Sequence, residues 1–257
     1  GDLCGKERVL PMNTGAEAVE TAIKVMRKWG YEVKGVTPGQ ANIIVASGNF
    51  HGRTTTIVGF SDDPDARDGF GPFAPGFTMV PYGDLAAVEA AIDENTVGVL
   101  MEPIQGEGGI RPASDAFLKG LRALCDAHGL LLIFDEVQCG IGRTAKLFAH
   151  EWAGIEPDVL AAAKALAGGF PIGACLAKEA PAAALTSGSH GSTFGGNPVA
   201  MAAANAVLDV ILEDGFLGHV REMGDYLKER LTGLAAKHPK ILKDVRGGGL
   251  LTGIACH

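Results

Sequence analysis

Short apolar runs alternate with helix-length amphipathic stretches along most of this chain, and this alternation constrains its fold more than any other feature. Such runs are typical of buried strands, and amphipathic stretches between them are typical of helices that cover a parallel sheet. The sequence therefore predicts an α/β fold with a mainly parallel sheet sandwiched by helices. The expected strands are residues 42–46, 97–101, 130–134, 159–162 and 173–177, and the expected helices are residues 16–31, 84–92, 114–128 and 197–213.

The sequence becomes richer in charged residues after Gly215. Residues 216–237 predict a charged amphipathic helix, and the segment Asp244-Val-Arg-Gly-Gly-Gly-Leu-Leu is expected to lead into a last strand. We therefore predict a large α/β domain over residues 1–214 and the beginning of a smaller, truncated C-terminal domain over residues 215–257.

Charge, cysteine content and chain ends limit the classes of protein that remain. The 257 residues include 22 Lys and Arg against 30 Asp and Glu, a formal charge of −8, with no basic block to attract nucleic acid or an anionic membrane. The five cysteines are scattered without a Cys-x-x-Cys spacing, which argues against disulfides or a zinc site and favours a cytoplasmic location. No run is long enough to span a membrane. The sequence begins at Gly1 without a recognisable N-terminal start and ends just after an apolar segment, residues 250–255, that is typical of a strand. We therefore expect it to be part of a larger polypeptide.

Lys164 and Asp135 are the two residues whose positions most strongly indicate a catalytic role. Lys164 follows an apolar alanine-rich stretch, where an unpaired buried ammonium is costly, and Asp135 ends an almost wholly apolar strand. Pyridoxal phosphate chemistry needs a lysine that can form a Schiff base and an aspartate that holds the pyridinium nitrogen. Taken singly, Lys164 could be a snorkelling surface side chain. Asp135 lies about thirty residues upstream on the neighbouring predicted strand, and this pairing favours the catalytic interpretation.

Two segments have the features of phosphate-binding loops. Asn13-Thr-Gly-Ala-Glu leads into a helix, and the N-terminal amides of a helix attract phosphate, although the same residues fit a simple N-cap. Ser192 and Thr193 lie in a glycine-rich loop before another helix, and their hydroxyls could bind phosphate oxygens. Their spacing alone indicates only a polar loop.

Three further positions carry side chains that could contact a ligand. Phe50 ends a strand and could stack on a cofactor ring, and Arg53 could bind a carboxylate. Taken alone, these residues favour the alternative that Phe50 is core and Arg53 a surface cation. His51 is a possible neighbour of the ring. Glu102 and Glu107 lie on a glycine-rich loop at the end of a strand, where ligands bind in open α/β sheets; they could also be solvated loop acids.

Six motifs taken together, in this order along nearly the whole chain, closely resemble the class III (subgroup II) aminotransferases. They are Asn13-Thr-Gly-Ala-Glu-Ala, Phe50-His-Gly-Arg-Thr, Glu102-Pro-Ile-Gln-Gly-Glu, Asp135-Glu-Val-Gln, Ala163-Lys164-Ala and Gly191-Ser-Thr-Phe-Gly-Gly-Asn-Pro. The resemblance implies the type I fold of pyridoxal-phosphate-dependent transferases and a homodimer with shared active sites. Within the family, the sequence looks similar to both the ornithine δ-aminotransferases and the N-acetylornithine aminotransferases.

The resemblance also implies roles for individual residues around the cofactor. Lys164 would be the Schiff-base lysine and proton shuttle, Asp135 the partner of the pyridinium nitrogen, and Thr193 a phosphate ligand across the dimer interface. The residues implied in cofactor binding are Gly15, Ala16, Phe50, Asp135, Gln138, Lys164 and Thr193.

The substrate contacts implied by the resemblance are fewer. Arg53 would bind a substrate carboxylate, and Ser192 would lie beside the substrate. Glu107 resembles the family's gate, which pairs with an arginine while the amino donor is bound. Ala145 stands where the family usually has glycine, which is expected to alter a turn without affecting the chemistry.

The expected activity is transfer of the δ-amino group of ornithine to 2-oxoglutarate, which gives glutamate and glutamate semialdehyde. The alternatives are N-acetylornithine as the amino donor, or a cofactor-binding fragment without turnover. Only small-molecule substrates and a second copy of the chain are expected as partners, and no metal is expected.

Overall fold

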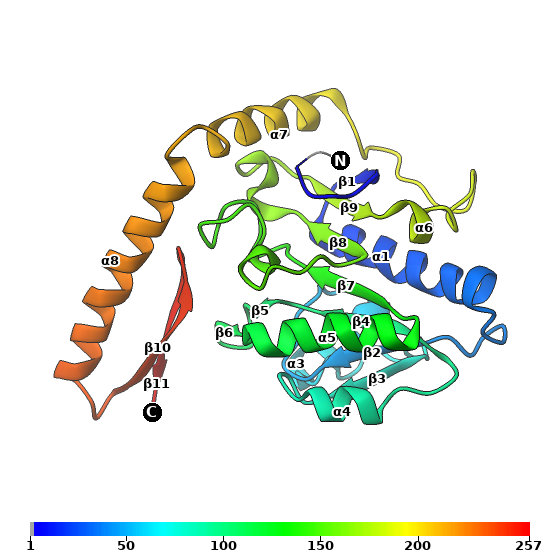
Figure 1. The fold of residues 1–257 in the computed structure, drawn as a ribbon, viewed down its shortest axis with the longest axis horizontal. Helices are drawn as coiled ribbons and strands as arrows, with labels where there is room; N and C mark the ends of the chain where they lie inside the picture. Colours follow the sequence, from blue (N-terminus) through cyan, green and yellow to red (C-terminus); the bar gives the residue numbers. More distant parts are fainter. Residues whose placement is uncertain (1–2) are drawn as a thin grey trace.

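A seven-stranded sheet organises the chain, and helices cover both of its faces (Figure 1). The computed structural model describes residues 3–257. Gly1 and Asp2, the first residues of the predicted partial chain, lie outside the described residues. The strand order is β1 (Arg8–Met12), β9 (Gly173–Ala177), β8 (Val159–Ala162), β7 (Leu131–Asp135), β4 (Thr96–Met101), β2 (Asn42–Ala46) and β3 (Phe77–Val80). Neighbours from β8 to β3 run parallel, whereas β9 is antiparallel to both β8 and β1. The predicted α/β fold with a mainly parallel sheet is confirmed.

The five expected strands are present with bounds that agree to within one residue. Strands β1 and β3 were not predicted. Both lie at the edges of the sheet and are only partly buried, so neither carries the continuous apolar run that marks the central strands.

The two faces of the sheet carry separate hydrophobic cores because successive side chains of a strand point to opposite sides. Ile43 of β2 and Ile133 of β7 pack with α1 (Gly15–Trp29) on one face. Ile44 and Leu132 pack with α5 (Asp115–His128) on the other face.

The predicted helix boundaries have clear physical causes. Ser114 accepts a hydrogen bond from the Phe117 amide and so caps α5, which ends before Gly129 in the left-handed conformation. Asn197 caps α7 (Pro198–Ile211) in the same way. The remaining short elements are the π-helical turn η1 (Gly30–Lys34), α2 (Thr55–Val58), α3 (Pro64–Arg67), α4 (Leu85–Ala90), β5 (Ile104–Gln105), β6 (Arg111–Pro112), α6 (Glu179–Ala182), and the 3-10 helices η2 (Ala149–Trp152) and η3 (Lys164–Ala167).

The last part of the chain forms a helix and a hairpin that lie beside the sheet (Figure 1). Helix α8 (Phe216–Lys237) has the predicted bounds, and it packs on the antiparallel pair β10 (Leu242–Gly248) and β11 (Leu251–Cys256). Residues 244–251 lead into the last strand, β11, as expected, and most of them are themselves strand β10, which was not predicted. Gly247 and Gly249 have positive φ angles of 107° and 56°, which suit a tightly turned hairpin. The division into two domains at residue 215 stays a prediction.

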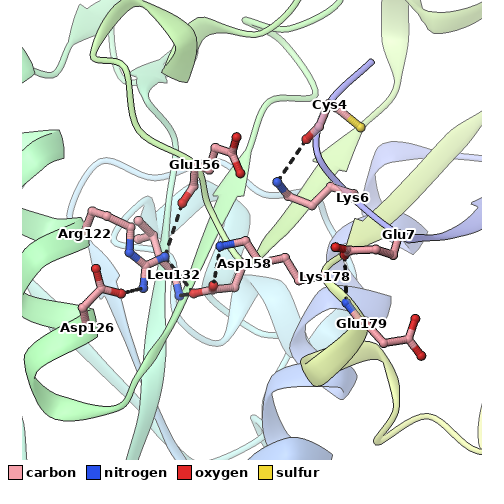
Figure 2. Close-up of polar contacts among 10 residues, drawn as sticks. All are labelled: Cys4, Lys6, Glu7, Arg122, Asp126, Leu132, Glu156, Asp158, Lys178 and Glu179. Atoms are coloured by element: carbon pink, nitrogen blue, oxygen red, sulfur yellow. Dashed lines mark hydrogen bonds and ion pairs between the residues drawn. The ribbon is translucent and has the colours of Figure 1, made fainter. Parts of the chain in front are cut away.

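A polar network centred on Asp158 joins elements at the amino end of β8 (Figure 2). The Asp158 carboxylate accepts hydrogen bonds from Arg122 Nη1 at 2.8 Å, Lys178 Nζ at 3.2 Å and the Leu132 amide at 2.9 Å. Arg122 belongs to α5, Leu132 to β7, and Lys178 follows β9. This network ties the core elements together at the end of the strands opposite to Asp135.

Candidate active site

A cavity of about 430 Å³ lies at the carboxyl ends of the parallel strands. In open α/β sheets, this edge is where ligands bind. The cavity is lined by residues from the start of α1 and from the segments after β2, β4, β7 and β8, namely Asn13, Thr14, Gly15, Ala16, Phe50, His51, Gly52, Glu102, Glu107, Asp135, Val137, Gln138, Ala163, Lys164, Gly169, Phe170, Pro171 and Ile172.

Asp135 is the last residue of β7, and its buried carboxylate is held from two sides. Oδ1 accepts a hydrogen bond from the Val137 amide at 2.9 Å, and Oδ2 lies 2.8 Å from His51 Nδ1. Burial of His51 opposes its protonation, but the hydrogen bond and charge of Asp135 and the charge of Glu102 outweigh it, so the pKa of His51 is raised. The prediction that a carboxylate at this position must be paired is confirmed, and the partner within the chain is His51.

Glu102 and Glu107, which the sequence placed on one loop, have different environments. Glu102 is buried and accepts hydrogen bonds from the amides of Phe50 at 3.1 Å and Gly106 at 3.3 Å. Burial raises the pKa of Glu102 to about 7, and the nearby charge of Asp135 acts in the same direction. Glu107 is exposed at the rim of the cavity. The interpretation of both as solvated loop acids is therefore wrong for Glu102, because the loop folds back under Phe50.

Lys164 lines the cavity directly after β8, but it is exposed and not buried as expected. The apolar run that precedes it is buried through Ala163, and the lysine follows where the chain leaves the sheet. Its φ angle is +45°, a left-handed conformation that costs a residue with a side chain about 1–2 kcal/mol. Gly168 and Gly169 also have positive φ angles, which agrees with the tight turn expected after Lys164. The strain indicates that the surrounding structure holds this residue in place.

The N-terminus of α1 has both of the features that the sequence left open. Thr14 and Glu17 form a capping box, which confirms the N-cap. Gly15 and Ala16 nevertheless line the cavity, and the first amides of a helix have no partners within the helix. A Cβ atom at Gly15 would lie 2.7 Å from Val137 Cγ1, so a glycine is needed for the helix to approach this side of the cavity.

Gln138 and Glu107 meet across the rim of the cavity. Gln138 Nε2 lies 3.4 Å from Glu107 Oε1, at the long end of the hydrogen-bond range. Gly106 allows this arrangement, because a Cβ atom there would lie 1.6 Å from Gln138 Oε1.

Three of the predicted site residues do not line this cavity. Arg53 is exposed, with its guanidinium carbon 5.9 Å from the centre of the Phe50 ring. Ser192 and Thr193 line a second hollow of about 440 Å³, which also contains Asn13. Ser192 Oγ accepts a hydrogen bond from Asn13 Nδ2 at 3.1 Å, so the two hollows meet at Asn13.

Several residues of the site were missed or underrated from the sequence, among them Phe170, Pro171 and Ile172, which line the cavity. Val137 lines the cavity from the turn that follows β7, and its position two residues after Asp135 was the available signal. His51 was only a possible ring neighbour. Its pairing with Asp135 spans 84 positions in the sequence, and no local pattern reports it.

The residues of the cavity fit pyridoxal phosphate. A phosphate suits the N-terminus of α1, a protonated ring nitrogen suits the buried carboxylate of Asp135, and an aldehyde suits the exposed amine of Lys164. Phe50 lines the same cavity and offers an aromatic surface.

Comparison with known proteins supports the same family. The model of the family described as "Aminotransferase class-III" matches residues 1–257. The chain is 52% identical over 250 residues to an acetylornithine aminotransferase of Mesorhizobium japonicum, covering 97% of this chain and 62% of that protein. It is also 52% identical over 253 residues to ornithine aminotransferase 2 of Staphylococcus aureus, covering 98% of this chain and 63% of that protein. The chain thus spans less than two thirds of the length of these relatives.

Solved structures give the same result. The ornithine aminotransferase of Toxoplasma gondii superposes with a TM-score of 0.96 at 40% identity, covering 100% of this chain and 61% of that one. The acetylornithine aminotransferase of Elizabethkingia anophelis superposes with a TM-score of 0.86 at 45% identity, covering 100% and 63%. Another structure of the Toxoplasma gondii enzyme is described as having partial occupancy of PLP at its active site. Within residues 3–257, no helix is long and apolar enough to cross a membrane.

Proposed function

The chain belongs to the class III aminotransferases, and from this premise we propose that it forms the cofactor-binding part of a pyridoxal-phosphate-dependent aminotransferase. The observation that carries the proposal is the placement of Lys164 and Asp135 in one cavity: Asp135 is the last residue of β7, and Lys164 follows its parallel neighbour β8. These are the two protein groups on which the chemistry of this cofactor depends most.

Lys164 and Asp135 have complementary tasks in this proposal. When bound, pyridoxal phosphate supplies a reactive carbonyl and a ring that withdraws electrons from the carbon that loses its proton. The Lys164 amine would hold the cofactor through its carbonyl carbon and would serve as the base that carries the proton. The Asp135 carboxylate would keep a proton on the ring nitrogen, and the Val137 amide and His51 hold that carboxylate in one orientation.

The other predicted cofactor contacts complete the proposed site. The amides at Gly15 and Ala16 would bind the phosphate at the positive end of α1. Phe50 would stack on the ring, and Gln138 would donate a hydrogen bond to its hydroxyl oxygen. Thr193 lines a separate hollow, which supports a role for Thr193 at the site of a second copy in a homodimer.

The proposed substrate contacts lie around the rim of the cavity. Arg53 would bind a substrate carboxylate, Ser192 would lie near the substrate, and Glu107 would act as the gate between the amino donor and 2-oxoglutarate. Glu107 already has a polar neighbour in Gln138, so moving the gate would alter a contact with the ring-binding side chain.

The proposed amino donor is ornithine, whose δ-amino group would pass to 2-oxoglutarate to give glutamate and glutamate semialdehyde. N-acetylornithine is the alternative, because relatives named for each donor are equally similar to the chain. A cytoplasmic location stays a prediction from the scattered cysteines.

Turnover with ornithine, N-acetylornithine and 4-aminobutyrate, each with 2-oxoglutarate, tests the proposed function in the purified protein. Activity with either of the first two donors, abolished in Lys164→Ala, is the expected result. Activity with 4-aminobutyrate alone would overturn the donor assignment. Visible absorbance of bound cofactor without turnover would instead identify a cofactor-binding chain that is not an enzyme by itself.

A further inference from the structure

Glu136 lies directly after Asp135 but takes no part in lining the cavity. Its carboxylate is fully buried on the other side of the chain, and burial of a carboxylate is costly unless donors surround it. The backbone of Glu136 extends the pairing of β7 with β8, since its amide donates to Ala161 O at 2.9 Å. The side chain therefore leaves the sheet just where the chain turns under the cavity.

The donors around Glu136 come mainly from one segment, the start of η2. The amides of Ala149 and His150 donate to the two carboxylate oxygens at 2.5 Å and 2.9 Å. His150 Nδ1 lies 2.6 Å from Oε1, and Cys139 Sγ lies 3.8 Å from Oε2. Hydrogen bonds to a charged acceptor are about twice as strong as neutral ones, so this is a strong attachment.

This attachment acts on the turn that carries the proposed cofactor contacts. The carbonyl of Glu136 accepts the Gly140 amide at 2.9 Å, which closes the turn over residues 136–140. Val137 and Gln138 lie inside that turn and line the cavity, while Glu136 holds the turn from behind. The His150 ring also stacks on the ring of Phe148, with 5.7 Å between the ring centres, and this contact holds the imidazole in place.

We propose that Glu136 is a positioning residue for the cofactor: by binding η2, it fixes the turn directly after Asp135, which presents Val137 and Gln138 to the cavity. This inference rests on the proposed function, because the benefit of a fixed turn is a fixed cofactor. Glu136 itself touches neither cofactor nor substrate.

Glu151 provides a matched control. It lies in the same 3-10 helix and accepts the Phe148 amide at 2.7 Å, so it stabilises η2 without contacting the cofactor turn. A defect that arises only from loosening η2 should therefore appear in Glu151→Gln as well. A defect that arises from releasing the turn should appear in Glu136→Gln alone.

The test compares Glu136→Gln, Glu151→Gln and the unsubstituted protein. In Glu136→Gln, an amide NH₂ group replaces one carboxylate oxygen and faces the N–H donors of η2, so the hydrogen bonds to that oxygen are lost. We expect Glu136→Gln to raise the dissociation constant for pyridoxal phosphate about tenfold or more and to reduce the visible circular dichroism of the bound cofactor. Glu151→Gln should change that constant less than about twofold. Equal effects of the two variants on the cofactor, or no effect of Glu136→Gln, would overturn the inference.

Two additional measurements keep the outcome interpretable. Amide hydrogen exchange in the cofactor-free protein should accelerate over residues 137–140 in Glu136→Gln but not in Glu151→Gln, so the attachment is tested even if the cofactor does not bind. Failure of the unsubstituted protein to bind pyridoxal phosphate would contradict the proposed function, not the attachment. If Glu136→Gln does not fold, His150→Phe removes the imidazole contact and leaves the two backbone amide bonds to Glu136, so it should weaken cofactor binding less, about twofold to fivefold, and speed amide exchange over residues 137–140. Absence of both changes would contradict the role of Glu136.

Discussion

His51 and Asp135 form a buried pair, with Nδ1 and Oδ2 2.8 Å apart, on the floor of a cavity whose other side carries Lys164. The pair joins the segment after β2 to the end of β7, two strands that are not neighbours in the sheet. Asp135 therefore has one oxygen held by its own turn and the other by a distant loop, which leaves the carboxylate little freedom to rotate.

Replacing His51 with Asn should remove a pH dependence of stability. The pKa of His51 is raised in the folded protein, so protonated His51 stabilises the fold below its unfolded pKa of about 6.5, and this contribution is lost as the pH rises through the folded pKa. As the pH rises above 6.5, we expect the unfolding free energy of the cofactor-free protein to fall more than that of His51→Asn. Urea unfolding at several pH values measures this, and parallel curves would contradict it.

Replacing Glu102 with Gln should alter stability in a lower pH range. Because the pKa of Glu102 is raised from 4.5 to about 7, the folded protein loses stability as the pH rises between these values. The neutral Gln side chain does not ionise, so Glu102→Gln should gain about 3 kcal/mol relative to the unsubstituted protein between pH 4.5 and pH 8. Glu107→Gln is the control, since the exposed Glu107 should produce no comparable gain.

The strained backbone at Lys164 predicts a difference between two inactive variants. At a φ angle of +45°, glycine avoids the steric cost that alanine bears, although it is less constrained in the unfolded chain. Lys164→Gly should therefore be more stable than Lys164→Ala by about 0.5–1 kcal/mol. Chemical unfolding without cofactor compares them directly, and a more stable Ala variant would show that this backbone conformation is not maintained.

Placing a side chain at Gly106 should displace Gln138. The new Cβ atom would overlap Gln138 Oε1, and the flexible amide would have to leave the cavity rim. We expect Gly106→Ala to weaken binding of pyridoxal phosphate about threefold to tenfold, as Gln138→Ala should, since one neutral hydrogen bond is lost. In the double variant the effects should not add, and additive losses of affinity would argue against a shared cause.

Several elements could be predicted from the sequence because their signals are local. Strands β2, β8 and β9 carry continuous apolar runs, and α5 has its cap at Ser114 and its end at Gly129 within the same segment. Edge strands and the hairpin strand β10 gave no such signal, since their partly buried residues do not form apolar runs.

The candidate site divides in the same way. Lys164 and Asp135 could be predicted because each is a charged residue at the end of a buried apolar run, where the sequence changes from apolar to charged side chains. The burial of Glu102, the exposure of Lys164 and the placement of Thr193 outside the cavity could not, since each depends on how distant loops fold over one another.

The sequence by itself determined the α/β class, the order of the central elements and the pair of residues that point to pyridoxal phosphate, because periodicity and residue type are encoded locally. Only the tertiary structure decided the partners of the two adjacent carboxylates, His51 for Asp135 and His150 for Glu136. His51 comes from the segment after β2 and His150 from η2, and the packing of these segments against the end of β7, not a local sequence pattern, brings each histidine to its carboxylate.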